Sequence, residues 1–210
     1  MLLSALALLS VALMACEGGR GVPTPPLDTT LSAHFALIEE GQSGPARVRI
    51  RRYMEAEGWT ARPLFLMGLS YHSERRYAKA AEWFEQSIAA ADIYPPAHHF
   101  LGWARYYLGQ PQGAAEAFRG HLLTTPGEGD SHFGLGLVAI EAGDLVEAER
   151  RFNAAINLQG GDDRSSGRAK AMTRLADVMA ARGRWAEADD AMDQFVATRQ
   201  RLRPDLGFPE

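Results

Sequence analysis

Histidine, carboxylate and serine side chains are the groups of this chain that could bind a metal ion or catalyse hydrolysis. Six histidines are present, and His98 and His99 form the most suggestive pair for a metal site. Neighbouring residues on a helix point about 100° apart, so these two imidazoles are poorly placed to share one ion. Adjacent carboxylates lie on expected exposed helix faces without an apolar pocket, at Glu39, Glu40, Asp189 and Asp190. No serine has the sequence context of an exposed nucleophile. The sequence therefore predicts no catalytic residue, no metal site and no cofactor.

Cys16 is the only cysteine in the chain, so no disulfide can form within it. It ends the sequence LMAC, which closes an uncharged apolar run over residues 1–15. The run is too short for a comfortable membrane span and suits the apolar part of a secretion signal. LMAC resembles the lipobox of bacterial lipoproteins, in which the cysteine is acylated, with palmitate among the fatty acids expected. The resemblance implies that residues 1–15 are a cleaved lipoprotein signal peptide and that Cys16 carries the lipid.

Residues 16–28 are rich in glycine and proline, as expected for an extended tether between a lipid anchor and a folded domain. The resemblance to lipoproteins implies a place in the bacterial cell envelope. Glu17 stands where an aspartate often signals retention in the inner membrane, so we expect the outer membrane, facing the periplasm. No basic residue precedes the apolar run, which leaves open a start upstream of Met1.

Composition indicates a folded domain without an affinity for nucleic acid. The chain has 210 residues, of which 46% are hydrophobic and 23% charged, so it can bury a sizeable core. Its formal net charge of −4 lacks the basic excess that a nucleic-acid-binding protein usually carries.

A period of about 34 residues runs through the rest of the chain. Glycine, alanine and phenylalanine recur in three registers: Gly68, Gly102 and Gly136; Ala80, Ala114 and Ala148; Phe84, Phe118 and Phe152. Gly109 and Gly143 also align, with Arg75 at the equivalent position one period earlier. His98 and His132 share a repeat position that packs between helices, which favours a structural role for both. This pattern resembles the tetratricopeptide (TPR) repeat.

The resemblance implies an all-α fold, a right-handed superhelical solenoid of antiparallel helix pairs with about four to five repeats over residues 29–203. The repeats expected are 27–60, 61–94, 95–128, 129–162 and 169–202, with a short C-terminal tail at 204–210. The segment Gly160–Arg168 interrupts the period. It is interpreted as a solvated connector, with a binding loop or a metal-binding Asp162/Asp163 pair as the alternatives.

The small residues have a physical reason in such an array. Gly68, Gly102 and Gly136 are expected to face the alanines of the second helix, where larger side chains would separate the helices. The phenylalanines are expected to fill the space one turn further on. Gly109, Gly143 and Gly183 are expected to end the first helices with a positive φ.

In TPR arrays the first helices of successive repeats line a concave groove. The groove positions implied by the register are Phe65, Leu69, His72, His99, Trp103, Tyr106, Tyr107, Phe133, Leu137 and Ile140. An exposed apolar strip of this kind usually marks a binding site, unless neighbouring helices cover it. We expect these side chains, Trp103 and Phe133 among them, to project into the groove without holding the fold together. The Lys, Asn and Arg clamp of chaperone-binding TPR domains is absent, so an apolar helix or peptide is the expected occupant.

A lipobox followed by a small TPR array resembles the outer-membrane lipoproteins that assist secretin assembly in type IV pilus biogenesis. It resembles equally the TPR lipoproteins that dock cell-wall enzymes. The expected function is a non-enzymatic, membrane-anchored scaffold that binds a protein partner through the groove. The resemblance implies secretin subunits as the specific partner. The alternatives are an adaptor for peptidoglycan enzymes and a metal-dependent or hydrolytic envelope enzyme.

Overall fold

The computed structural model describes residues 29–91, 94–158 and 166–202, and all the regular structure in these ranges is helical. The helices are α1 (Thr29–Glu39), α2 (Ser43–Glu57), α3 (Ala61–Ser73), α4 (Tyr77–Ala89), α5 (Pro95–Tyr107), α6 (Pro111–Thr124), α7 (Gly129–Glu141), α8 (Leu145–Leu158), α9 (Ser166–Ala181) and α10 (Trp185–Leu202). The expected signal peptide, Cys16, the tether and the C-terminal tail lie outside the described residues. None of the described helices is long and apolar enough to cross a bilayer.

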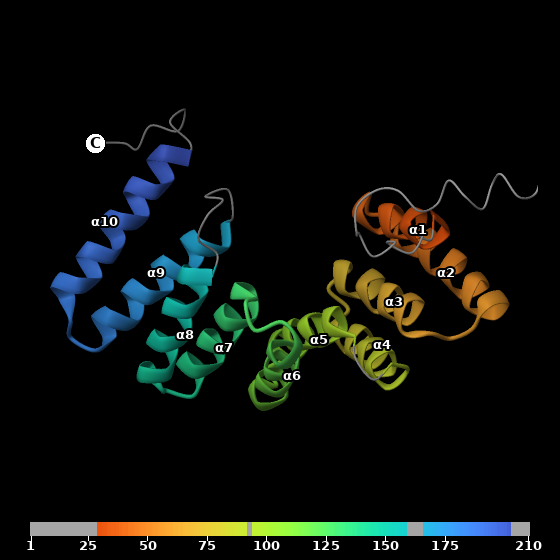
Figure 1. Ribbon diagram of the computed structural model, residues 1–210, viewed down its shortest axis with the longest axis horizontal. Coiled ribbons are helices and arrows are strands. Elements are labelled where there is room, and N and C mark those ends of the chain that lie inside the picture. Colours follow the sequence, from red (N-terminus) through yellow and green to blue (C-terminus); the bar gives the residue numbers. More distant parts are fainter. Residues whose placement is uncertain (1–28, 92–93, 159–165, 203–210) are drawn as a thin grey trace, which may run out of the picture.

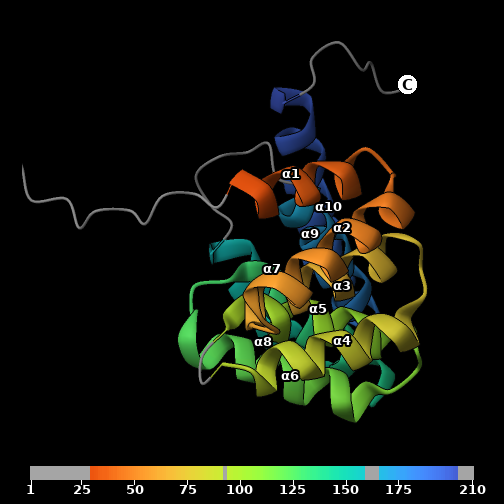
Figure 2. The same ribbon diagram turned by 90° about the vertical axis from the view of Figure 1, so that its right-hand side faces the viewer.

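The helices pack in consecutive pairs that form an arc (Figure 1). In Figure 1 α3 and α5 lie on the inner side of the arc, with α4 and α6 outside them. Figure 2 views the arc from its α1–α2 end, where the later pairs lie behind the first. First helices also contact the first helix of the next pair, from α1 to α3, α5, α7 and α9. The expected all-α solenoid of helix pairs is thus confirmed.

Short turns containing a residue with positive φ join the two helices of each pair. Gly109, Gly143 and Gly183 have φ values of 69°, 74° and 76°, as the repeat register predicts. Arg75 takes the equivalent place between α3 and α4 with φ 59°, a conformation that disfavours a side chain. Proline begins α5 and α6, where the missing N–H has no helical partner to lose.

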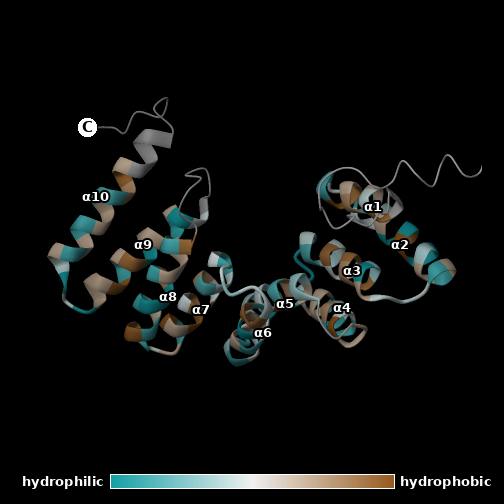
Figure 3. Cartoon of the chain, viewed as in Figure 1, coloured by the Kyte–Doolittle hydropathy of each residue, from teal (hydrophilic) through white to brown (hydrophobic). Residues whose placement is uncertain are grey.

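Phenylalanine is the centre of the packing within each pair. Phe84, Phe118 and Phe152 are fully buried on α4, α6 and α8. A Cβ at Gly68 would lie 2.5 Å from the ring of Phe84, and this ring, more than Ala80, is what excludes a side chain. The phenylalanine thus reaches across to the glycine backbone, a contact that the expected facing of glycines and alanines did not include. Figure 3 shows hydrophobic and hydrophilic bands alternating along the helices, the pattern of amphipathic packing.

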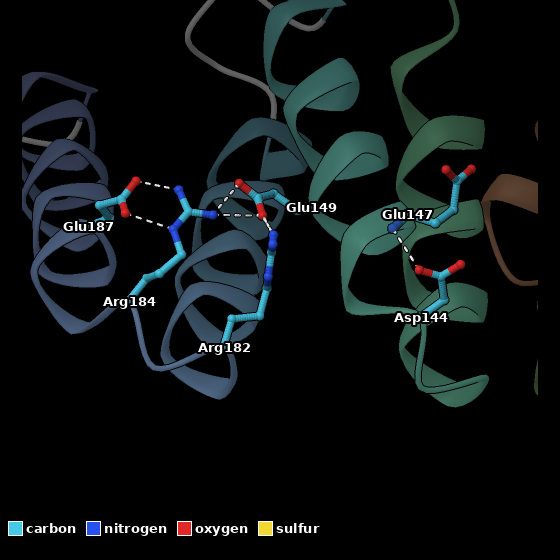
Figure 4. Close-up of polar contacts among 6 residues, drawn as sticks. All are labelled: Asp144, Glu147, Glu149, Arg182, Arg184 and Glu187. Carbon is cyan, nitrogen blue, oxygen red and sulfur yellow. Dashed lines mark hydrogen bonds and ion pairs between the residues drawn. The ribbon is translucent and has the colours of Figure 1, made fainter.

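Ion pairs join the last three helices (Figure 4). Glu149 on α8 accepts hydrogen bonds from Arg182 and Arg184, which flank the turn between α9 and α10. The Arg184 Nη1 atom lies 2.7 Å from Glu149 Oε1, and the same guanidinium pairs with Glu187 on α10. At the start of α8, Asp144 caps the helix by accepting the Glu147 N–H at 2.9 Å.

The segment expected as a connector, Gly160–Arg168, is helical in its last part. Ser166, Gly167 and Arg168 belong to the first turn of α9, and Arg168 Nη1 donates to the Ile156 carbonyl oxygen at 3.3 Å. Because this bond ties α9 back to α8, the connector is shorter than the sequence suggested. Asp162 and Asp163 lie outside the described residues.

Candidate protein-binding surface

The expected groove residues lie on α3, α5 and α7, at positions that share one face of each helix. Their spacing of three, four and seven residues places them on successive turns of the same side. We call the ten residues the inner strip: Phe65, Leu69 and His72 on α3; His99, Trp103, Tyr106 and Tyr107 on α5; Phe133, Leu137 and Ile140 on α7. Because these helices contact one another, the three sets are neighbours.

Aromatic rings connect the inner strip from repeat to repeat. The His72 ring on α3 lies 6.4 Å from the Tyr107 ring on α5, and the Trp103 ring lies 6.3 Å from the Phe133 ring on α7. Tyr107 also stacks on Tyr77 of α4, with ring centroids 4.6 Å apart. The side chains therefore form a continuous aromatic row across three repeats.

Exposure differs along this row. Tyr107 is 53% exposed and is the most accessible ring of the inner strip. Phe65 is 9% exposed and belongs to the core, contrary to its expected place on an open groove. It is covered because the Tyr94 and Phe100 rings pack edge-on against it, at 5.6 and 5.5 Å. The other eight residues are half-buried.

Trp103 and Phe133 also serve the fold, which corrects the expectation that they project free of it. The Trp103 ring lies 5.2 Å from the buried ring of Phe118, and the Phe133 ring lies 5.6 Å from that of Phe152. Each ring therefore stabilises the packing of its own helix pair. Truncating either residue changes packing as well as the surface.

Phe100 also lies at this surface, although it is not among the ten residues of the inner strip. Its half-buried ring lies 5.6 Å from His72 and 5.2 Å from His99. The signal available in the sequence was its spacing of seven residues from Tyr107, which places the two on the same side of α5.

A polar network lies beneath the centre of the inner strip and joins α5, α6 and α7. Ser131 is completely buried, and its Oγ lies 3.0 Å from His99 Nδ1 and 2.8 Å from His121 Nδ1. His99 Nε2 lies 3.3 Å from an Asp130 oxygen that also accepts a 3.1 Å hydrogen bond from Trp103 Nε1. Sequence reasoning missed this network, because it depends on which side chains meet across a repeat boundary.

The carboxylate fixes the direction of these hydrogen bonds when the histidines are neutral. Asp130 is an acceptor, so His99 donates from Nε2 and its Nδ1 must accept. Ser131 then donates its hydroxyl proton to His99 and accepts from His121 Nδ1–H. The two neutral histidines thus hold different tautomers, His99 with its proton on Nε2 and His121 with its proton on Nδ1.

Burial lowers the pKa of His121 below 6.5, and the nearby His99 lowers it further. His72 has its pKa lowered by burial first and by His99 second. Burial acts to raise the pKa of Asp130, but hydrogen bonding to His99 and to Trp103 outweighs it, so this carboxyl pKa is lowered. Burial also raises the phenol pKa of Tyr107. Burial thus favours the neutral forms of His72, His121 and Tyr107, and the hydrogen bonds favour the ionised form of Asp130.

Serine, histidine and aspartate do meet here, but not as a hydrolytic triad. Ser131 has no exposed surface, so a substrate could not reach its hydroxyl. His98 and His132 are half-buried, as the register predicted, with pKa values lowered by burial. Within the described ranges, no group of three or more His, Cys, Asp or Glu side chains is placed to hold a metal ion. Glu39, Glu40, Asp189 and Asp190 are exposed.

Comparisons with known proteins agree with this architecture. The family model described as tetratricopeptide repeat matches residues 101–167. No curated protein matches the sequence significantly. The structure is similar to that of MamA from Desulfovibrio magneticus RS-1, with a TM-score of 0.72 and 14% identity over 82% of this chain and 94% of that one.

Two further solved structures are similar. The first is Pseudomonas aeruginosa PilF, with a TM-score of 0.72 and 16% identity over 81% of this chain and 75% of that one. The second is YrrB, described as a TPR protein with an unusual peptide-binding site, with a TM-score of 0.66 and 18% identity over 81% of this chain and 85% of that one. Identities this low establish the shared fold alone.

Proposed function

We propose that the chain, whose residues 101–167 match the tetratricopeptide-repeat family, is a scaffold that holds a segment of another protein along the inner strip. TPR domains generally bind protein partners and carry no catalysis of their own. We assign partner binding to the inner strip because of the side chains that this surface exposes.

The observation that carries the proposal is the aromatic row through Trp103, Tyr107 and Phe133. Half-exposed aromatic rings in a row offer a large apolar contact area at a small cost in side-chain entropy. Two carboxylates, Asp130 at Trp103 and Glu141 at Tyr106, lie beside the described strip, and none of its ten residues is a lysine or an arginine. An apolar helix or an extended apolar peptide fits this chemistry.

The second part of the proposal is a lipid anchor at Cys16, which holds the scaffold at the bacterial envelope, on the outer membrane. It is supported by the LMAC sequence and by the absence of any other cysteine. The test is Cys16→Ser, which should abolish labelling by a clickable fatty acid and release the chain from the membrane fraction. Labelling that persists in the variant contradicts the anchor.

The third part is the partner, for which we propose secretin subunits of a type IV pilus system. The first support is the combination of a lipobox with a small TPR array. The second is the similarity of the fold to that of Pseudomonas aeruginosa PilF. The identity of the partner is measured separately, by capture of secretin subunits.

The experiment compares two variants. In the first, Tyr106 and Tyr107 are both changed to alanine. The second is the control, Leu123→Ala, which changes an 86% exposed residue on α6. Tyr106 and Tyr107 make fewer contacts with buried rings than Trp103, so the double variant should stay folded by circular dichroism. It should lose capture of secretin subunits and leave them as monomers on a gel that preserves the multimer. Leu123→Ala should behave as the parent. Unchanged capture by the folded double variant contradicts the inner strip, and capture of a cell-wall enzyme in place of secretin contradicts the partner.

A further inference from the structure

Basic side chains gather in the first part of the domain, above all on α2, which carries no residue of the inner strip. Residues 45–79 contain eight arginines and lysines and three glutamates, although the whole chain has an acidic excess with a net charge of −4. Four of the arginines lie on α2, at Arg47, Arg49, Arg51 and Arg52. The proposed scaffold role does not use α2.

Three of these arginines line a pocket between α2 and α3. Its volume is about 390 Å³, and its lining residues are Gly44, Arg47, Val48, Arg51, Arg52, Glu55 and Tyr71. The residues of α2 in this lining follow helical spacing, so they share one face of the helix. That face is turned away from the buried residues Ala46, Ile50 and Met54.

Arg47 is held in position at the base of the pocket. Its Nη2 lies 2.9 Å from Glu74 Oε1, and its Nη1 donates to the Ser70 carbonyl oxygen at 3.3 Å. Its guanidinium lies 4.5 Å above the Tyr71 ring. Arg76 approaches the same ring at 4.9 Å. Glu74 therefore neutralises part of the charge here, while fixing the orientation of the arginine.

Arg51 and Arg52 are exposed, and no ion pair joins either of them to another residue in the described parts of the chain. A planar guanidinium with several N–H donors matches the oxygens of a phosphate group better than an ammonium does. Glu55 stands at the rim, one turn further along α2, and is the carboxylate of the lining. The lining thus offers three guanidinium groups against one carboxylate.

We infer that this arginine pocket binds a phosphate group, with Arg51 and Arg52 as the principal donors and Arg47 as a fixed third. Tyr71 forms the aromatic wall against which the Arg47 guanidinium is ordered. The site is open on the side of α2 that no other helix covers, since α2 packs on α1 and α3 alone among the described helices.

Two sources could supply the phosphate, an anionic phospholipid headgroup or a free phosphate compound. The place of α2 favours the headgroup, and this part rests on the proposed lipid anchor. Residues 17–28 span at most about 40 Å when fully extended, so α1 and α2 are the helices held nearest to an acylated Cys16. Basic residues close to an anionic membrane surface each strengthen attachment appreciably.

The test uses the full chain with Cys16→Ser, so that the result is independent of acylation. Two probes are used: inorganic phosphate, followed by 31P NMR line broadening, and vesicles of phosphatidylcholine with or without phosphatidylglycerol. Arg51→Glu should weaken binding of the probe about tenfold or more. Arg49→Glu makes the same charge change on the same helix outside the pocket, and should change binding about twofold at most.

Glu55→Gln removes the opposing charge at the rim and should tighten binding by about two- to fivefold. Binding to anionic vesicles that is stronger than to phosphatidylcholine alone, with Arg51→Glu the damaging change, supports a headgroup site. Binding of inorganic phosphate without any preference for anionic vesicles supports a free phosphate ligand. Equal losses for Arg49→Glu and Arg51→Glu, or no binding of either probe, overturn the pocket. Circular dichroism verifies that each variant is folded.

Discussion

The ring of Phe118 on α6 occupies the place that a side chain on Gly102 of α5 would take. A Cβ built at Gly102 lies 2.5 Å from both Cδ1 and Cε1 of that ring, a distance that real Cβ atoms do not show. Gly134 on α7 meets the other edge of the same ring, also at 2.5 Å. One phenylalanine thus sets the approach of two first helices, within its own repeat and to the next.

Gly102→Ala should therefore destabilise the domain, although alanine is the better helix former. Overpacking of this kind costs roughly 1–3 kcal/mol, which exceeds the gain of about 1 kcal/mol in helix propensity. Urea denaturation measures the difference in free energy of unfolding. Gly44→Ala is the control, because a Cβ there lies 4.0 Å from its nearest neighbour. Stability of Gly102→Ala equal to that of the parent contradicts the packing described.

Arg75→Gly should stabilise the protein. Within the described ranges, Arg75 is the one non-glycine residue with a positive φ. It stands at a turn position where the later repeats have glycine. Relief of the left-handed conformation should gain about 0.5–1 kcal/mol after the greater flexibility of glycine in the unfolded chain is counted. The measurement is the urea midpoint at constant slope. Arg76→Gly, in the adjacent position with negative φ, should destabilise, and a loss of stability in Arg75→Gly refutes the argument.

Ser131→Ala should cost roughly 1–3 kcal/mol of stability, since it leaves an imidazole nitrogen of both His99 and His121 without a partner. NMR of the imidazole nitrogens tests the network itself. In the parent, neutral His99 should carry its proton on Nε2 and neutral His121 on Nδ1. The same tautomer in both residues is incompatible with the directions assigned above.

Stability should fall as the pH drops below about 6.5. The pKa values of His72, His98, His121 and His132 are lowered in the folded protein, in each case first by burial. The unfolded chain therefore binds protons near pH 6.5 that the folded chain does not bind. The stabilisation is complete above that pH and is lost as the pH falls toward the lowered values. Urea denaturation at about pH 7.5 and about pH 5.5 measures the change, and equal or greater stability at the lower pH contradicts it.

The repeat architecture could be predicted because the residues that define it recur at a fixed period in the sequence. Gly68, Gly102 and Gly136 recur in register with the phenylalanines, and Gly109 recurs as the residue that ends a first helix. Such a pattern depends on local helix geometry, which sequence spacing reports directly. The contact of Gly102 with Phe118 could not be predicted, because the reach of a phenylalanine ring across the pair depends on its rotamer and not on sequence spacing.

The candidate surface was predictable in its position and less so in its details. The register placed Trp103 and Tyr107 on the correct helix face, but their exposures differ because neighbouring repeats cover them unequally. Phe65 is buried by Phe100, a contact between repeats. The pairing of His99 with Ser131 was also out of reach, since it joins residues from successive repeats through side-chain directions. The arginine pocket on α2 likewise arises from tertiary packing against Tyr71.

Site-specific photocrosslinking tests the central proposal most directly. A photoreactive phenylalanine analogue in place of Tyr107, the 53% exposed ring of the inner strip, should form a covalent adduct with the partner in intact envelopes. The same analogue in place of Leu123 on the outer helix α6 is the control and should give no adduct with that protein. Adducts from position 107, mapped to an apolar segment of the partner, are the predicted result. Adducts from position 123 alone, with none from position 107, contradict binding on the inner strip.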